Sequence, residues 1–144
     1  MVLIQNSCHE CHKLIPFEIG QTAIDNKLRW YISYNCPFCD SSTEFDDIGF
    51  PPEEIRQEIL KYEGEWEIII ENFERQKQTV TKLLRKTLEL STVELHQKLK
   101  TLRKIPSILH SGTKCEMEWL YNHLKSDGIE SIILQSKRPE KMSS

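Results

Sequence analysis

Four of the five cysteines in this 144-residue sequence fall into two identical pairs. Cys8 and Cys11 form the first C-x2-C pair, Cys36 and Cys39 form the second, and 24 residues separate the pairs. Each pair can deliver two thiolates from one tight turn, and two such turns supply the four soft ligands that Zn²⁺ binds in a tetrahedron. Four thiolates leave no open position for water, so the spacing predicts a structural zinc site and no metal-based catalysis.

The same residues admit other interpretations. The run from Cys8 to His12 also has the spacing of a covalent haem motif, and each C-x2-C pair has the spacing of a redox-active dithiol. His9 or His12 could replace a cysteine as a ligand. A haem motif would leave the second pair without a role, and no β-α-β pattern surrounds either pair. Structural zinc is therefore the prediction.

The residues between the cysteine pairs read as β-strands, most clearly the aromatic run Leu28–Tyr34. A cysteine turn, strands and a second cysteine turn resemble a zinc ribbon, which we expect over residues 1–50. So few residues bury little apolar surface, and the metal is expected to replace part of the core. The ribbon is net acidic, which makes nucleic acid a less favoured partner for its aromatic residues than their own core.

Pro51 and Pro52 mark the boundary after the ribbon, because proline favours the first turn of a helix. We expect a linker helix over residues 51–64, with Ile55 and Ile59 on its apolar edge and glutamates facing water. Residues 65–135 then predict the order β-α-α-β-α-β, and residues 136–144 a flexible tail. The predicted fold class is α+β.

Two helices are predicted within Lys77–Leu99, and charge is sorted on the first. Its apolar stripe consists of Val80, Leu83, Leu84 and Leu88. The opposite face carries Gln78, Lys82, Arg85 and Lys86. Capping boxes predict where the later helices begin, at Ser91 with Glu94 and at Thr113 with Glu116.

This half of the chain resembles the C-terminal domain of the bacterial ribosomal stalk protein. The likeness rests on Trp66–Ile70, Lys77–Leu95, Pro106–Gly112, Thr113–Leu124 and the cap at Gly128. It implies a compact domain whose first helix presents basic and small apolar residues to translational GTPases or ribosome-associated factors. The matched positions are Lys77, Lys82 and Arg85 for the basic residues and Val80 for the apolar one. Gln78 and Thr81 stand where the family has small or branched apolar contacts.

The charge distribution also points to an acidic protein partner. Residues 1–50 carry 3 basic and 7 acidic side chains, residues 51–75 carry 3 and 8, and residues 76–144 carry 13 and 7. A basic surface on the C-terminal half favours an acidic partner, or else packs near the acidic segment of the same chain. Trp119 either packs against the linker helix or ribbon, or is an exposed anchor for the partner.

No run of about 18 apolar residues is present, so no membrane span is expected. The first ten residues lack the features of a signal peptide, and we expect a cytoplasmic chain. No phosphate loop, catalytic triad or paired carboxylate stands out, so we expect neither an enzyme nor a small-molecule substrate. The sequence predicts a protein-binding adaptor. The alternatives are an immunity protein that neutralises a toxin and a nucleic-acid-binding zinc ribbon.

Overall fold

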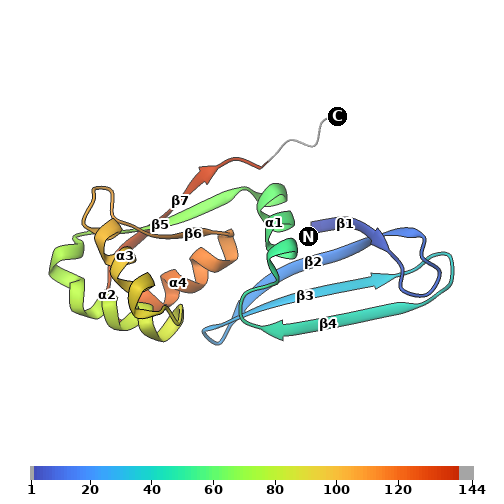
Figure 1. Ribbon diagram of the computed structural model, residues 1–144, viewed down its shortest axis with the longest axis horizontal. Helices are drawn as coiled ribbons and strands as arrows, with labels where there is room; N and C mark the ends of the chain where they lie inside the picture. The colour runs from blue at the N-terminus through green and yellow to red at the C-terminus, as the bar shows by residue number, and fades with distance from the viewer. Residues whose placement is uncertain (1, 140–144) are drawn as a thin grey trace. The chain divides into compact units, whose positions relative to one another are not determined.

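The computed structural model describes residues 2–139, which divide into two compact units, residues 2–63 (unit 1) and 64–138 (unit 2). The fold class is α+β, with two antiparallel sheets and four helices (Figure 1). Among residues 2–139, no helix has both the length and the apolar character needed to cross a membrane.

Unit 1 is built on a four-stranded antiparallel sheet in which every strand pairs with the next along the chain. The strands are β1 (Val2–Ser7), β2 (Leu14–Ile24), β3 (Lys27–Asn35) and β4 (Ser42–Ile48). Asp25 and Asn26 connect β2 to β3 with φ values of 54° and 63°. Two consecutive residues with positive φ make the turn that matches the twist of a tight hairpin. The two remaining connections contain the cysteine pairs.

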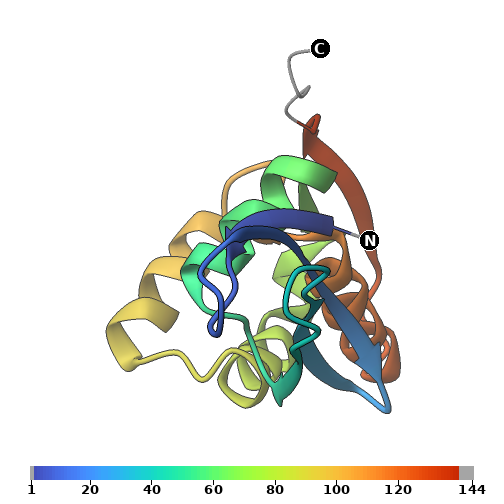
Figure 2. The ribbon, with the colours of Figure 1, turned by 90° about the vertical axis from the view of Figure 1, so that its right-hand side faces the viewer.

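Helix α1 (Glu53–Glu63) belongs to the packing of unit 1. Ile59 is 2 % exposed and forms a buried cluster with Val2 and Ile19, against which Ile55 also packs. Val2 and Ile19 face each other across the β1–β2 pairing, so the helix covers one face of the sheet. The apolar edge expected on a linker helix thus packs within unit 1, and Figure 2 shows α1 beside the strands of that unit.

Unit 2 has the expected element order. Its elements are β5 (Glu65–Ile70), α2 (Phe73–Thr87), α3 (Thr92–Leu102), β6 (Ile108–Gly112), α4 (Lys114–Ser126) and β7 (Ser131–Lys137). Strand β5 lies between β6 and β7 in an antiparallel sheet, and the three helices lie on one side of that sheet (Figure 1). The buried apolar side chains of the helices include Phe73, Val80, Leu83, Leu84, Leu95, Leu102, Met117, Leu120 and Leu124.

Both predicted capping boxes are confirmed. The hydroxyl of Ser91 accepts the N–H of Glu94 at 3.2 Å, and the carboxylate of Glu94 accepts the N–H of Ser91 at 3.1 Å. Thr113 and Glu116 make the same pair of bonds, both at 3.1 Å, but these two side chains are fully buried. The caps fix where α3 and α4 begin.

Some boundaries differ from the sequence prediction. Helix α2 begins at Phe73, because Asn72 starts it in a left-handed conformation without a side-chain cap. Strand β7 continues to Lys137, so the first residues of the expected tail pair with β5. Residues 140–144 of that tail lie outside the described residues.

Candidate metal centre

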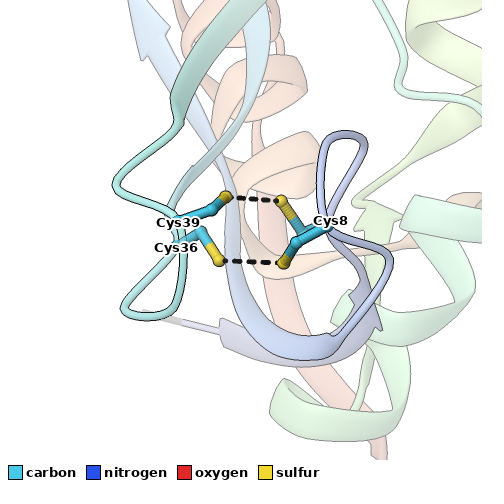
Figure 3. A group of neighbouring side chains, drawn as sticks. Cys8, Cys36 and Cys39 are labelled. Atoms are coloured by element: carbon cyan, nitrogen blue, oxygen red, sulfur yellow. Dashed lines mark hydrogen bonds between the residues drawn. The ribbon is translucent and has the colours of Figure 1, made fainter.

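The two cysteine pairs lie in two turns at the same end of the sheet of unit 1. Cys8 and Cys11 are in the connection from β1 to β2, and Cys36 and Cys39 are in the connection from β3 to β4. Because β2 and β3 pair with each other, the two turns are brought face to face (Figure 3). Cys8 and Cys36 are buried, Cys11 is half-buried and Cys39 is exposed.

The backbones of the two turns repeat the same hydrogen bonds. The N–H of Cys8 donates to the carbonyl of Lys13 at 2.9 Å, and the N–H of Cys36 donates to the carbonyl of Ser41 at 2.8 Å. Each carbonyl of a first cysteine also accepts a backbone N–H from four residues later, that of His12 at 2.9 Å and that of Asp40 at 3.1 Å. His12 and Asp40 have nearly equal positive φ values, 63° and 61°. Two unrelated peptide segments therefore adopt one turn geometry, which presents two sulfurs from each.

The four sulfur atoms converge on one point. The sulfur of Cys8 lies 3.7 Å from that of Cys39, the sulfur of Cys11 lies 3.6 Å from that of Cys36, and all four lie within 4.8 Å of one another. A disulfide needs about 2.05 Å, so none of these pairs is bonded. A tetrahedron with metal–sulfur bonds of about 2.3 Å has edges of about 3.8 Å. The cluster is therefore positioned to hold one metal ion.

Two of the thiols have lowered pKa values, which favours their ionised form. The pKa of Cys8 is lowered from 9.0 to about 5, first by the backbone N–H of Cys11 and then by the hydroxyl of Ser41. The hydroxyl and backbone N–H of Ser41 also lower the pKa of Cys39. The Ser41 oxygen lies 3.2 Å from the sulfur of Cys8 and 3.0 Å from that of Cys39, so one hydroxyl serves both turns.

The cluster itself opposes ionisation of a third thiol, that of Cys11. The backbone N–H of Lys13 favours the thiolate of Cys11, but burial and the neighbouring sulfurs outweigh it and raise the pKa of Cys11 to about 11. Several thiolates at such short distances repel one another. A bound cation reverses this effect, because it stabilises every thiolate that it contacts. The chemistry of this set of donors thus fits a divalent metal ion.

No histidine joins the ligand cluster among residues 2–139. His9 instead lies with its ring 6.2 Å from that of Tyr34. Ser41 was not identified from the sequence. The only indication is its position two residues after Cys39, where the turn places the Ser41 hydroxyl close to the sulfur.

The residues predicted to bind a partner lie mainly on one face of α2. Gln78, Lys82, Arg85 and Lys86 are exposed, whereas Lys77 and Thr81 are half-buried. The hydroxyl of Thr81 donates to the carbonyl of Lys77 at 2.7 Å, so it is used within the helix. Arg75 is exposed on the same face, one turn earlier, and was missed because the helix was expected to begin later. We call the exposed residues Arg75, Gln78, Lys82, Arg85 and Lys86 the α2 basic face.

The charges of the α2 basic face are not neutralised within the described part of the chain. The ion pairs within residues 2–139 include those of Lys61 with Glu58, Lys114 with Glu118 and Lys137 with Glu65. None involves α2.

Of the two interpretations of Trp119, the one in which it is an exposed anchor is wrong. Its side chain is only 8 % exposed, and its ring makes an edge-on contact with that of His123, with 5.2 Å between the ring centroids. Helix α4 buries Glu116, Met117 and Leu120 beside it, so more than one face of this helix is covered. Trp119 is therefore not part of an exposed partner surface.

The chain matches no protein-family model, no curated protein and no solved structure.

Proposed function

We propose that this chain is a non-enzymatic adaptor, in which four cysteines hold a structural Zn²⁺ and the α2 basic face binds an acidic surface on a partner protein. The observation that carries the proposal is a row of exposed cationic side chains on α2 that form no ion pair in the described chain. A protein of this kind would work in the reducing cytoplasm, where cysteines remain available to a metal.

Zinc is the metal that best suits this site. Zn²⁺ accepts four thiolates in a tetrahedron without a preferred d-electron geometry, whereas Mg²⁺ and Ca²⁺ require oxygen ligands. Cys8, Cys11, Cys36 and Cys39 would occupy every coordination position and leave none for water or substrate. This supports a structural role for the metal.

The partner is proposed to be a protein with an acidic surface. Lys82 and Arg85 lie opposite the buried side chains of Val80, Leu83 and Leu84, so they face away from the core of unit 2. Two arginines and two lysines give this face donors for carboxylates, and arginine can bind a carboxylate with two hydrogen bonds. The order β5-α2-α3-β6-α4-β7 is the β-α-α-β-α-β order of the part of the sequence that resembles the ribosomal stalk domain. A GTPase or a ribosome-associated factor is therefore the first class of partner to test.

The test is a double charge reversal, Lys82→Glu with Arg85→Glu, compared with Lys100→Glu with Lys125→Glu. All four side chains are exposed, and both double variants change the net charge equally. We expect the first double variant to lose capture of the partner from native lysate and the second to retain it, with both folded by circular dichroism. Equal capture by the two would refute the proposed binding face.

A second candidate is an immunity protein that blocks a toxin. Unit 1 favours it, because residues 1–63 carry 5 basic and 11 acidic side chains. The contact surface would then lie on unit 1 and face a basic toxin. Cross-linking of the captured partner distinguishes the two functions, since cross-links to α2 support the adaptor and cross-links to unit 1 alone support immunity. Nucleic acid is the less favoured partner, because the acidic unit 1 repels phosphate.

A further inference from the structure

A groove runs between the edge strand β1 and helix α1, entirely within unit 1. It has a volume of about 1050 Å³ and is lined by the consecutive residues Val2–Asn6 and by one side of α1. Its apolar lining residues include Leu3, Ile4, Ile55 and Tyr62. Figure 2 shows β1 passing beside the helix.

The two edges of the sheet of unit 1 differ in how they are protected. Strand β4, at one edge, carries Glu44, Asp46 and Asp47, and charges on an edge strand discourage pairing with another chain. Strand β1, at the other edge, has the sequence VLIQNS, without a charge, a proline or an irregularity in its pairing with β2. Half of the backbone polar groups of an edge strand point away from the sheet, and within residues 2–139 no other strand pairs with this side of β1.

The charges around the groove select a basic occupant. Glu54 and Glu58 line it from α1, and the one cation among the lining residues, Lys61, lies 3.7 Å from Glu58 in an ion pair. The excess of acidic side chains in unit 1 acts in the same direction. A second copy of unit 1 would bring together two acidic surfaces, so the charges disfavour a dimer formed through β1.

We propose that this groove binds an extended, basic peptide segment of a partner protein, which adds to the sheet as a strand beside β1. The main-chain bonds would come from the outer edge of β1. Because side chains alternate along a strand, every second one would enter the apolar space between β1 and α1, near Ile4, Ile55 and Tyr62. Lysine or arginine flanking these apolar positions would meet Glu54 and Glu58. This surface is distinct from the α2 basic face, which takes an acidic partner.

The test uses the full zinc-loaded chain and synthetic peptides of about six residues, the length of a typical strand. One peptide alternates isoleucine and threonine between terminal lysines, and its matched control has glutamates in place of the lysines. We expect the basic peptide to shift the backbone NMR signals of residues 2–6 and of α1, and the acidic peptide to bind far more weakly. Equal binding of both peptides, or shifts confined to other strands, would overturn the proposal.

A matched pair of variants tests the acidic wall. Glu54 lines the groove, whereas its neighbour Glu53 does not, although both are exposed in the first turn of α1. Glu54→Lys is expected to weaken binding of the basic peptide by roughly fivefold, about 1 kcal/mol, and Glu53→Lys to leave it unchanged. An equal effect of the two variants would contradict a specific contact between the basic peptide and Glu54. If sedimentation shows a dimer and the basic peptide does not dissociate it, the β1 edge binds a second copy of the chain instead.

Discussion

Unit 1 and unit 2 have similar lengths but bury different amounts of apolar surface. All seven residues of β4 are exposed, and the buried side chains of unit 1 form two small clusters. In unit 2, three helices place their leucines against one sheet. A sheet with so thin a covering needs another source of stability, and the cysteine cluster lies where β1, β2, β3 and β4 are joined. If the proposed metal binds, it would stabilise unit 1 in the way that the apolar layer of helices stabilises unit 2.

The largest expected effect follows from removing one ligand. Cys36→Ser takes away a buried thiolate, and structural zinc sites contribute about 10–16 kcal/mol to folding. We expect residues 2–63 to unfold and to be cleaved rapidly by protease, while residues 64–138 persist as a fragment. Limited proteolysis with mass spectrometry measures this. Cys115→Ser, which changes the fifth cysteine, is the control and is expected to leave both units intact.

The corresponding change in unit 2 is a cavity in its core. Leu84 is fully buried, and Leu84→Ala is expected to cost about 2–5 kcal/mol of unfolding free energy. Chemical denaturation followed by tryptophan fluorescence and far-UV circular dichroism measures the loss, and the zinc content should stay unchanged. Val93→Ala, at a side chain that is 67 % exposed, should cost less than about 0.5 kcal/mol. Loss of zinc from the Leu84→Ala variant would show that the two units do not depend on separate sources of stability.

The two capping boxes provide a smaller comparison inside unit 2. Thr113→Ala should cost about 2 kcal/mol, because it leaves a buried N–H without its acceptor. Ser91→Ala should cost about 0.5 kcal/mol, because water can replace the exposed hydroxyl. Thermal unfolding of the two variants checks the order. Equal losses would mean that burial does not set the strength of these caps.

The smallest expected effect is a dependence on pH at the exposed cap. The backbone N–H and then the hydroxyl of Ser91 hold the pKa of Glu94 below its ordinary value of 4.5. The folded-state pKa is depressed, so this contribution to stability is present above pH 4.5 and is lost as the pH falls through the folded value. An NMR titration of the Glu94 carboxyl should give a midpoint below 4.5. Ser91→Ala removes only the hydroxyl and keeps the backbone N–H, so the midpoint should rise part of the way toward 4.5, and an unchanged midpoint would contradict the hydroxyl as a cause.

The sequence predicts those features that depend on local spacing. Two C-x2-C pairs were sufficient to predict the ligand cluster, because each turn fixes its own two sulfurs and the hairpin between them joins the turns. The capping boxes at Ser91 and Thr113 were predicted for the same reason, since each is complete within four residues.

Features that depend on contacts between distant residues could not be predicted in this way. Helix α1 has the composition of an acidic linker, and only the position of Val2 and Ile19 shows where Ile59 packs. Helix α2 begins at Phe73, and its N-cap residue Asn72 makes no side-chain cap hydrogen bond, so no capping box marks its start. Trp119 could not be assigned from the sequence to a buried or an exposed position, because periodicity assumes one buried side and α4 is covered on more than one.

The most direct test of the account is to titrate the purified chain with a zinc chelator while recording the backbone amide NMR spectrum. We predict one Zn²⁺ per chain at the start, bound by Cys8, Cys11, Cys36 and Cys39. As the metal leaves, the amide signals of residues 2–63 should collapse to unfolded positions, and those of residues 64–138 should remain dispersed. A metal-free chain whose unit 1 signals stay dispersed would contradict the claim that the metal holds this unit together.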